Sequence, residues 1–586
     1  MTVLKNMGAV STPPDWKSIN WTKVEEEVMK LQVRIAKATK QGRWNKVKAL
    51  QWLLTHSFSA KYLAVKRVTT NRGKRTPGVD GVVLKKDEEK YNMVRSMSRR
   101  NYQPQPLRRI YIPKSGGGNK RRPLGIPTML DRAQQALYTL ALTPVAETMA
   151  DQNSYGFRPQ RSAADAIQRI HATTSRKYDP QWVLEGDIKG CFDNIDHEWL
   201  LRNVVMDRVI LQKWLKAGFL EKATLFPTEK GTPQGGIISP CLANIVLDGM
   251  ETVLDKEFGS RRNISGRRNR QMRRVTKLNG VRMCRYADDF VISGSSKELL
   301  ETEVRPVIEA FLKERGLELS AEKTKITHTT KGYDFLGQNV RRYILRSGGS
   351  ILLTKPSKKN VRAFLTAVRI TIRKMATSKQ EDLIRTLNPM IRGWGNYHRH
   401  IVSKDVYNKV DHEIWTALWR WAKRRHQNKG LKWINQRYFR TIKGVRWVFS
   451  CQVRDEGGNK QLLTLAKTSA IRIIRHVHIK LAANPFDPAW DAYFEKRQSV
   501  KMQHSYEGRG TLISLWRRQG GLCPQCGKRL PASGHTGIIH YIKGRLKGGE
   551  PILSNLILLH PDCHAEGHKN GFVVKLPVGA PEMPPL

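Results

Sequence analysis

The sequence lacks any apolar run long enough to cross a lipid bilayer. A membrane-spanning helix needs roughly 18–20 consecutive apolar residues, and no segment of the 586-residue chain reaches that length. The N-terminal segment also has no apolar stretch behind a basic one, so no signal peptide is expected. Both absences predict a cytoplasmic protein without a membrane partner.

Cysteine is scarce and unevenly spread. Four of the seven cysteines are scattered along the chain, and the other three lie near the C-terminus among histidines: Cys523, Cys526 and Cys563. This distribution favours reduced thiols and one metal site over a disulfide framework.

Acidic residues are few beside the basic ones. The chain has 104 Lys and Arg against 50 Asp and Glu, a formal net charge of +54. An ordinary solvated basic surface accounts for a far smaller surplus, so we expect a polyanion to neutralise the charge, and nucleic acid is the expected partner. A basic disordered tail is excluded because 39% of the residues are hydrophobic and 15 are Trp. At this length several domains are expected.

Residue patterns divide the chain into an α+β part and a more helical part. Apolar residues recur at helical spacing between residues 20 and 70, and residues 108–126 place two basic arms around a Gly-rich turn, which predicts a β-hairpin. Helices are expected at 130–150, and mixed strands and helices to about residue 341. After Tyr343 the pattern is mostly helical. Its aromatic and basic faces suit a groove that follows a nucleic-acid backbone, or plain helical cores with solvated charged faces.

An aspartate pair stands at the tip of an expected hairpin. β-prone residues flank Tyr286–Asp289, which predicts that Asp288 and Asp289 lie exposed and close together on a tight turn. A chance Asp-Asp turn on a solvated hairpin would look the same. Support comes from Asp187 at the end of a short apolar strand, because phosphodiester synthesis needs carboxylates that bridge two Mg²⁺ ions about 3.5–4 Å apart. The carbonyl of Ile188 would add a ligand.

Phe192 follows Asp187 after a short turn. Its ring is well placed to block a sugar 2′-hydroxyl, which predicts a preference for dNTPs over ribonucleotides. Together with the three aspartates it predicts a Mg²⁺-dependent nucleic-acid polymerase.

Seven ordered segments resemble the sequence blocks of reverse transcriptases. They are RRPLGIPT (121–128), NSYGFRPQRS (153–162), DIKGCFDNIDH (187–197), GTPQGGIISP (231–240), RYADDF (285–290), GLELSAEKTKITH (316–328) and GYDFLG (332–337). The Ala in YADD and the phrase SYGFRP make the chain similar to group II intron-encoded proteins, or maturase-reverse transcriptases, over about residues 15–570. The resemblance implies an α+β multidomain fold: a right-hand reverse transcriptase with fingers and palm, an α-helical thumb called domain X, and a small C-terminal ββα-metal HNH-like zinc module.

The resemblance also implies roles for single residues. It assigns catalysis and two Mg²⁺ ions to the three aspartates already named, and contacts with the incoming dNTP to four further residues: Lys114, Arg122, Phe192 and Gln234. Fixed cations suit a transferring phosphoryl group. The alternative for Lys114 and Arg122 is a plain surface charge, and for residues 233–236 an ordinary loop before a helix.

The family implies RNA and DNA partners as well. Residues 393–400 (GWGNYHRH) fall in its thumb, and the arginine-rich segment 261–277 lies just before the catalytic hairpin, where it would touch RNA phosphates or form a solvated loop. The protein would help a group II intron RNA fold and splice as a ribonucleoprotein. It would then copy that RNA template from a DNA primer at a target DNA site, by target-primed reverse transcription.

The C-terminal Cys/His segment has the spacing of a structural zinc site. Cys523-x-x-Cys526 and His560-x-x-Cys563 provide the two ligand pairs of a tetrahedral Zn²⁺ site, and ordinary buried cysteines are the alternative. The segment resembles an HNH endonuclease domain, in which histidines hold a further divalent ion. The residues at its motif positions are His540, Tyr541, Asn555, His564 and His568.

The HNH resemblance departs from its pattern at the general base. Aligning residues 547–549 and Asn555 with the motif puts His540 at a metal position and Tyr541 at the base. A phenol with an ordinary pKa of about 10 is a poor base at pH 7. A shift by one residue makes His540 the base but puts Ile539 at the metal position. Nicking of target DNA and a degenerate domain kept for DNA binding or folding therefore both stay open.

Six parts are expected along the chain. They are the N-terminal extension with the start of the fingers (1–105), reverse transcriptase fingers and palm (106–345), thumb or domain X (346–430), a DNA-binding region (431–507), the HNH-like domain (508–572) and a disordered tail (573–586). Two other functions compete with this interpretation. A pure RNA-binding splicing factor is disfavoured by the intact aspartates, and a stand-alone reverse transcriptase of a retron-like element by the helical region and the C-terminal module.

Overall fold

The protein is described by a computed structural model that covers residues 16–113, 121–222, 224–232, 235–258, 280–454, 458–503, 506–530 and 537–572. Four expectations lie outside these ranges: those for Lys114, Gln234, the arginine-rich segment 261–277 and the tail 573–586. Within the ranges, no helix is both long enough and apolar enough to span a membrane.

The N-terminal part is helical, as its apolar spacing predicts. After the short η1 (Trp16–Ser18), helices α1 (Trp21–Lys40), α2 (Trp44–His56), α3 (Phe58–Thr70) and α4 (Asp87–Ser96) pack around the long α5 (Met129–Met149). Asn20 caps α1 by accepting a hydrogen bond from the Lys23 amide at 3.0 Å. The face of α1 that carries Val28 and Ile35 is buried in this cluster.

The fingers sheet contains the predicted basic hairpin. Strands β1 (Leu107–Pro113) and β2 (Arg121–Ile126) pair antiparallel, and β4 (Phe219–Glu221) and β5 (Thr224–Phe226) extend the sheet in the order β2-β1-β4-β5. Arg122 lies opposite Ile112, near the hairpin end of β2. Helices α8 (His197–Asn203) and α9 (Arg208–Leu215) precede β4 in the chain.

The palm sheet contains the strands that end or begin at the predicted carboxylates. Its order is β6 (Arg282–Tyr286), β7 (Asp289–Gly294), β3 (Trp182–Asp187) and β8 (Lys325–His328), all antiparallel. Because side chains alternate along a strand, Leu184 and Ile292 pack on one face and Val183 and Val291 on the other. The first face meets α10 (Ser239–Leu247), α11 (Met250–Glu257), η2 (Leu299–Val304) and α13 (Arg305–Lys313), and the second meets α6 (Ala163–Thr174).

Beyond the palm the chain forms the expected helical thumb. A sheet of β9 (Tyr333–Phe335), β10 (Gln338–Ile344) and β11 (Ser350–Pro356) leads into α14 (Lys358–Lys374), α15 (Gln380–His398), α16 (Lys404–Arg425) and α17 (Leu431–Tyr438). A second sheet then follows, which the mostly helical pattern did not predict: β12 (Phe439–Ile442), β13 (Val445–Arg454) and β14 (Lys460–Thr464). Its first hairpin turns at Lys443 and Gly444, both with positive φ, and positive φ at both central residues characterises two-residue hairpin turns.

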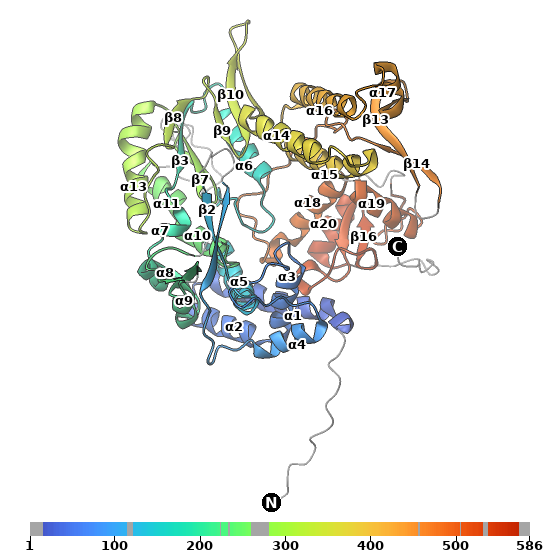
Figure 1. Cartoon of the computed structure of the whole chain (residues 1–586). Helices are drawn as coiled ribbons and strands as arrows, with labels where there is room; N and C mark the ends of the chain where they lie inside the picture. The colour runs from blue at the N-terminus through green and yellow to red at the C-terminus, as the bar shows by residue number, and fades with distance from the viewer. Residues whose placement is uncertain are drawn as a thin grey trace, which may run out of the picture.

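The C-terminal module folds back onto the first helix. It contains η3 (Pro488–Trp490), α18 (Asp491–Gln503), α19 (Tyr506–Arg518), β15 (Ile538–Tyr541), η4 (Arg545–Lys547), η5 (Leu553–Asn555), β16 (Leu556–Leu559) and α20 (Pro561–Asn570), with β15 and β16 paired antiparallel. Figure 1 shows this red module beside the blue N-terminal helices. Lys543 forms an ion pair with Glu26 of α1, and a Cβ on Gly548 would meet the Glu26 backbone at 2.3 Å.

Candidate polymerase site and metal clusters

Three carboxylates meet at one end of the palm sheet. Asp187 is the last residue of β3 and lies directly opposite Asp289, the first residue of β7. Between β6 and β7, Ala287 and Asp288 form a two-residue turn in which Ala287 has a φ of 58°, in the left-handed region. The three side chains line a cavity of about 580 Å³, whose other walls come from β2, α7 (Cys191–Asn194) and α10. The predicted hairpin with aspartates at its tip is therefore present.

Two buried residues, Arg285 and Gly156, support the turn between β6 and β7. Arg285 is fully buried, pairs with Asp248 at 2.5 Å and donates to the carbonyl of Ala287 at 3.3 Å. On the other side, the backbone at Gly156 contacts the turn so closely that a Cβ there would lie 2.4 Å from the Ala287 nitrogen. The SYGF segment and the YADD turn are thus packed backbone against backbone, which explains a glycine at this position.

The three carboxylates repel one another. Removal from bulk water, together with the charges of Asp288 and Asp187, raises the pKa of Asp289 to about 6. The pKa of Asp288 is raised by the same removal from water and by Asp187. One cation relieves part of the repulsion, because Lys323 Nζ pairs with Asp187 Oδ2 at 2.8 Å. A hard divalent cation is the usual partner of such a set of carboxylate oxygens.

The remaining walls of the cavity bring together two of the four predicted nucleotide-binding residues. Arg122 on β2 and Phe192 on α7 both line it. The Phe192 carbonyl accepts from the Thr232 amide at 2.6 Å, which joins the start of the GTPQGG segment to α7. Ile188 forms an isolated bridge with Leu319, and its two hydrogen bonds use the neighbouring backbone groups rather than the Ile188 carbonyl.

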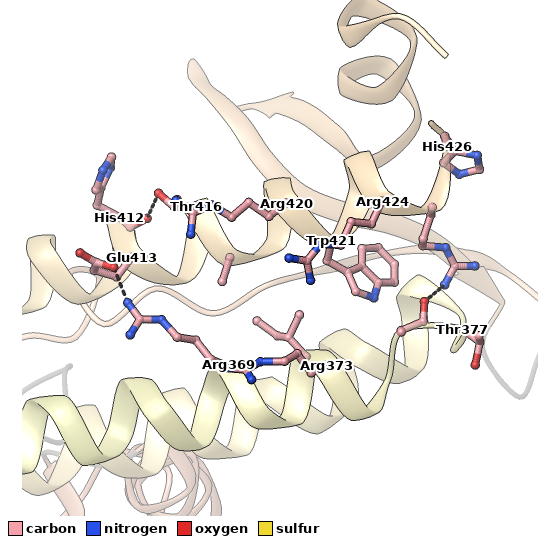
Figure 2. A pocket seen from close by; sticks show the side chains of 14 residues that line it. Arg369, Arg373, Thr377, His412, Glu413, Thr416, Arg420, Trp421, Arg424 and His426 are labelled. Carbon is pink, nitrogen blue, oxygen red and sulfur yellow. Dashed lines mark hydrogen bonds and ion pairs between the residues drawn. The ribbon is translucent and has the colours of Figure 1, made fainter. Parts of the chain in front are cut away.

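A basic groove of about 860 Å³ lies in the thumb, between α14 and α16. Figure 2 shows side chains from both helices pointing toward it, among them four arginines: Arg369, Arg373, Arg420 and Arg424. Arg369 donates to Glu413 at 2.6 Å. The Trp421 ring forms part of the wall, and its Nε1 donates to the Met375 carbonyl at 3.0 Å. Cationic and aromatic groups thus share one hollow surface.

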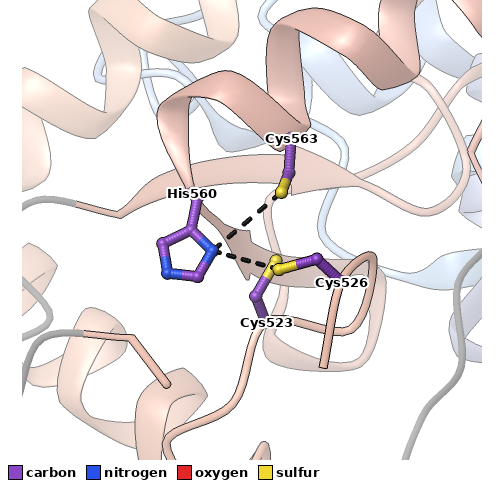
Figure 3. A group of neighbouring side chains, drawn as sticks. All are labelled: Cys523, Cys526, His560 and Cys563. Carbon is purple, nitrogen blue, oxygen red and sulfur yellow. Dashed lines mark hydrogen bonds between the residues drawn. The ribbon is translucent and has the colours of Figure 1, made fainter. Parts of the chain in front are cut away.

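The four predicted zinc ligands converge in the C-terminal module. The ligand atoms of Cys523, Cys526, His560 and Cys563 lie within 4.8 Å of one another, and Figure 3 shows the three sulfur atoms gathered beside the His560 ring. His560 Nδ1 is 3.4 Å from Cys526 Sγ, and its Nε2 is 3.0 Å from the Arg529 carbonyl. Because the carbonyl can only accept, Nε2 carries the proton and Nδ1 is left to bind a metal. The donors therefore suit zinc.

The HNH-type residues form a second cluster. His540, His564 and His568 all approach Glu495 of α18, and the four ligand atoms lie within 4.8 Å of one another. Burial raises the pKa of Glu495, but hydrogen bonds from the three histidines outweigh it and hold that pKa well below its ordinary value. The Tyr541 side chain does not join this cluster and contacts Gln498 instead.

Tyr541 and Asn555 make structural contacts in this module. The Tyr541 hydroxyl donates to Gln498 Oε1 at 2.7 Å. Burial raises the pKa of the phenol, which makes it a still poorer general base at neutral pH. Asn555 accepts from the Lys543 amide at 2.8 Å and donates to the Glu550 carbonyl at 3.0 Å, which closes the loop between β15 and β16.

Four families match the chain in succession. They are the N-terminal domain of reverse transcriptase (16–97), reverse transcriptase or RNA-dependent DNA polymerase (112–340), the group II intron maturase-specific domain (361–439) and HNH endonuclease (523–570). Group II intron-encoded protein LtrA of Lactococcus lactis subsp. cremoris is 33% identical over 416 residues, which span 58% of this chain and 68% of the relative. The chain belongs to the group II intron-encoded proteins.

The chain is also similar to a second curated protein and, at low identity, to one solved structure. Protein YkfC of Escherichia coli K12 is 35% identical over 360 residues, which cover 55% of this chain and 92% of that protein. Telomerase from Candida albicans, solved with a fragment of telomeric RNA, shares 12% identity and a TM-score of 0.31 over 57% of this chain and 64% of the telomerase chain.

Membership settles the class of activity of this group II intron-encoded protein. It is an RNA-directed DNA polymerase with a maturase domain and a C-terminal HNH-type domain, and its partners include RNA. Its reverse transcriptase and HNH domains imply the use of divalent metal ions. The predicted α+β architecture, with reverse transcriptase and zinc-compatible HNH-type modules, is confirmed.

Some residues of the intron-encoded protein's sites were missed in the sequence. Lys323 lies inside the reverse transcriptase block of residues 316–328. Its ion pair with Asp187 depends on the path that the chain takes into β8. Arg285 directly precedes YADD, and its local sequence predicts a surface charge. Its buried partner, Asp248, is distant in the chain and is not indicated by any neighbouring residue. Glu495 lies on α18, outside the residues that match the HNH family. Its acidic side chain on a helix upstream of those residues is the signal by which the sequence could have pointed to it.

Proposed function

We propose that Asp187, Asp288 and Asp289 hold the two Mg²⁺ ions of the polymerase, with the Ile188 carbonyl as a further ligand. The observation that carries this proposal is the convergence of three mutually repelling carboxylates on one cavity. Bound there, the ions would activate the primer 3′-hydroxyl and neutralise charge on the triphosphate. The protein's own part is to hold the carboxylates in register across β3 and β7, and to hold Asp288 on a turn that Arg285 and Gly156 support.

We further propose that this cavity takes dNTPs. Arg122 faces the same cavity as the aspartates, where a fixed cation would meet the triphosphate. Phe192 on α7 would exclude a 2′-hydroxyl, and Lys114 and Gln234 keep their predicted contacts with the nucleotide. The neighbouring backbone of Gly235, with a φ of 112°, packs on the Gly125 carbonyl and brings that loop against β2.

The division of labour along the chain is part of the same proposal. The N-terminal extension (1–105) and the thumb (346–430) would hold the intron RNA and the template-primer duplex, and the region 431–507 would contact target DNA. The arginines on both sides of the thumb groove support a phosphate-binding role there. Such contacts position nucleic acid and do not read its sequence.

In the C-terminal module we propose a structural Zn²⁺ at Cys523, Cys526, His560 and Cys563. The orientation of His560 by the Arg529 carbonyl supports this assignment. The three HNH-type histidines would hold a further divalent ion. We propose that the module binds target DNA without nicking it, because the base position is held by Tyr541, whose hydroxyl is engaged by Gln498.

Asp288→Asn tests the polymerase assignment. The substitution keeps the size of the side chain and removes one metal-binding charge. We expect Mg²⁺-dependent extension of a DNA primer on an RNA template to be abolished, while intron RNA binding and splicing stay at the level of the unmodified protein.

A matched control is Asp334→Asn. Asp334 is an exposed residue of β9 that accepts from Asn339 at 2.7 Å, so both activities should persist. Extension that survives Asp288→Asn would contradict the active-site assignment. Splicing lost together with extension would contradict the separation of the two functions.

A further inference from the structure

Helix α18 is built into the C-terminal module although it precedes the residues that match the HNH family. Ser499 Oγ accepts from the Ile539 amide at 2.9 Å, and Glu495 Oε1 accepts from the Tyr541 amide at 3.2 Å. These two side chains lie one turn apart on α18 and meet alternate amides of β15, so the helix occupies the edge of the two-stranded sheet. Both are buried, with 2% of Glu495 and 1% of Ser499 exposed.

The other carboxylate oxygen of Glu495 stands where three imidazoles converge. Glu495 Oε2 is 3.0 Å from His540 Nδ1, 2.7 Å from His564 Nε2 and 2.8 Å from His568 Nε2. His564 and His568 are one turn apart on α20, which puts both rings on one face of that helix. His540 comes from β15, so three separate elements supply the cluster.

This donor set matches a tetrahedral divalent ion. Three imidazole nitrogens and one carboxylate oxygen are ligands that zinc accepts at about 2.0–2.2 Å, and four atoms at such distances from one centre stand about 3.3–3.5 Å apart. The observed separations from Glu495 Oε2, 2.7–3.0 Å, are shorter by about 0.3–0.8 Å, a gap that rotations of the side chains would close. A neutral imidazole has one N–H, and a shared cation satisfies all four groups at once.

Glu495 changes what such a site can do. A catalytic metal site keeps one position open for water or substrate, whereas a structural site fills all four with protein atoms. With three histidines alone the fourth position is open, but the buried carboxylate of Glu495 lies directly at it. A DNA phosphate would then find no free coordination position.

We propose that Glu495 is the fourth ligand of a closed divalent-metal site with His540, His564 and His568, which fastens α18 to the module and leaves no position for cleavage chemistry. This deepens the proposed function, on which it rests for the non-nicking role of the module. The same helix reaches the palm, because Arg497 donates to Asp165 of α6 at 2.7 Å. The site therefore ties the module to the polymerase.

Metal analysis of the full-length protein tests the ligand assignment. After loading with Zn²⁺ and exhaustive dialysis, we expect two ions per chain in the unmodified protein and in Gln498→Ala, which alters the same face of α18 without touching a ligand atom. Glu495→Ala should lose one ion, or hold it at least tenfold more weakly, and Cys526→Ser should lose the other. Two tightly held ions in Glu495→Ala would overturn the proposal.

A second measurement uses the unmodified protein, so it does not depend on whether Glu495→Ala folds. Azide is added to the cobalt-substituted protein and the visible spectrum is recorded. A closed site predicts no change, because a small anion needs an open coordination position. A shift in the cobalt bands would overturn the closed site. Primer extension and plasmid nicking are measured on the same preparations, so a failure of the polymerase or non-nicking proposal is seen separately from a failure of the metal proposal.

Discussion

Gly156→Ala provides a sharp test of how the catalytic turn is held. A Cβ at residue 156 would lie 2.4 Å from the Ala287 nitrogen and 2.9 Å from the Tyr286 carbonyl carbon. Ordinary contact begins near 3.4 Å, so the turn must retreat by about 1 Å. Both atoms are backbone, and no side-chain rotation can relieve the contact.

The size of the effect follows from that displacement. Misplacing a catalytic group by about 1 Å costs on the order of 100-fold in rate, which corresponds to about 2.7 kcal/mol of transition-state stabilisation. We expect Gly156→Ala to lower the single-turnover rate of primer extension on RNA by about that factor at saturating dNTP and Mg²⁺. The thermal midpoint of unfolding should fall modestly, because overpacking costs about 1–3 kcal/mol.

Gly510→Ala is the matched control. Gly510 lies within α19 and a Cβ there meets no atom within 4 Å. Replacing a helical glycine by alanine stabilises by about 0.5–1 kcal/mol, so this variant should be slightly more stable and fully active. If Gly156→Ala extends primers within a few-fold of the unmodified protein, the SYGF segment does not position the turn and the reasoning is wrong.

Two other outcomes are expected. Phe192→Val should admit ribonucleotides, measured as the ratio of rNTP to dNTP incorporation, and an unchanged ratio would remove Phe192 from sugar selection. Burial lowers the pKa of His398, His400 and His478 to about 4 each. In the unfolded chain these histidines take up protons near pH 6.5. The free energy of unfolding should therefore fall as the pH drops from about 6.5 to 4. His398 alone would contribute about 3 kcal/mol, so His398→Gln should show a smaller loss between pH 7 and 5 in thermal unfolding, and an equal loss would refute the linkage.

Short sequence patterns were enough to predict the carboxylate cluster, whose residues lie on and beside the adjoining strands β3 and β7. The strand ending at Asp187 and the tight turn before Asp289 are both encoded in a few neighbouring residues, because strand propensity and turn chemistry are local properties. The four zinc ligands were predicted from their spacing and the HNH-type residues from the family resemblance, and the structure brings the zinc ligands together and likewise His540, His564 and His568. In each case the pattern that predicts a ligand lies in the few residues around it, although the parts of each site lie far apart in the chain.

The features that the sequence did not predict depend on contacts between distant segments. Glu495 reaches His540 only because α18 lies along β15, and Gly156 meets Ala287 only because two loops cross. The strands between residues 439 and 464 depart from the mostly helical pattern predicted after Tyr343. The two-residue turn at Lys443 and Gly444 joins the first two of these strands.

The contact between Gly548 and helix α1 has a consequence for the order of assembly. Glu26 and Gly548 are separated by most of the chain, and a ribosome adding about 5–20 residues per second needs roughly half a minute to two minutes to make what lies between them. Throughout that interval the surface of α1 around Glu26 exists without its covering. An RNA that reaches α1 during synthesis would meet an open surface, whereas one that arrives later would find the C-terminal module already seated there.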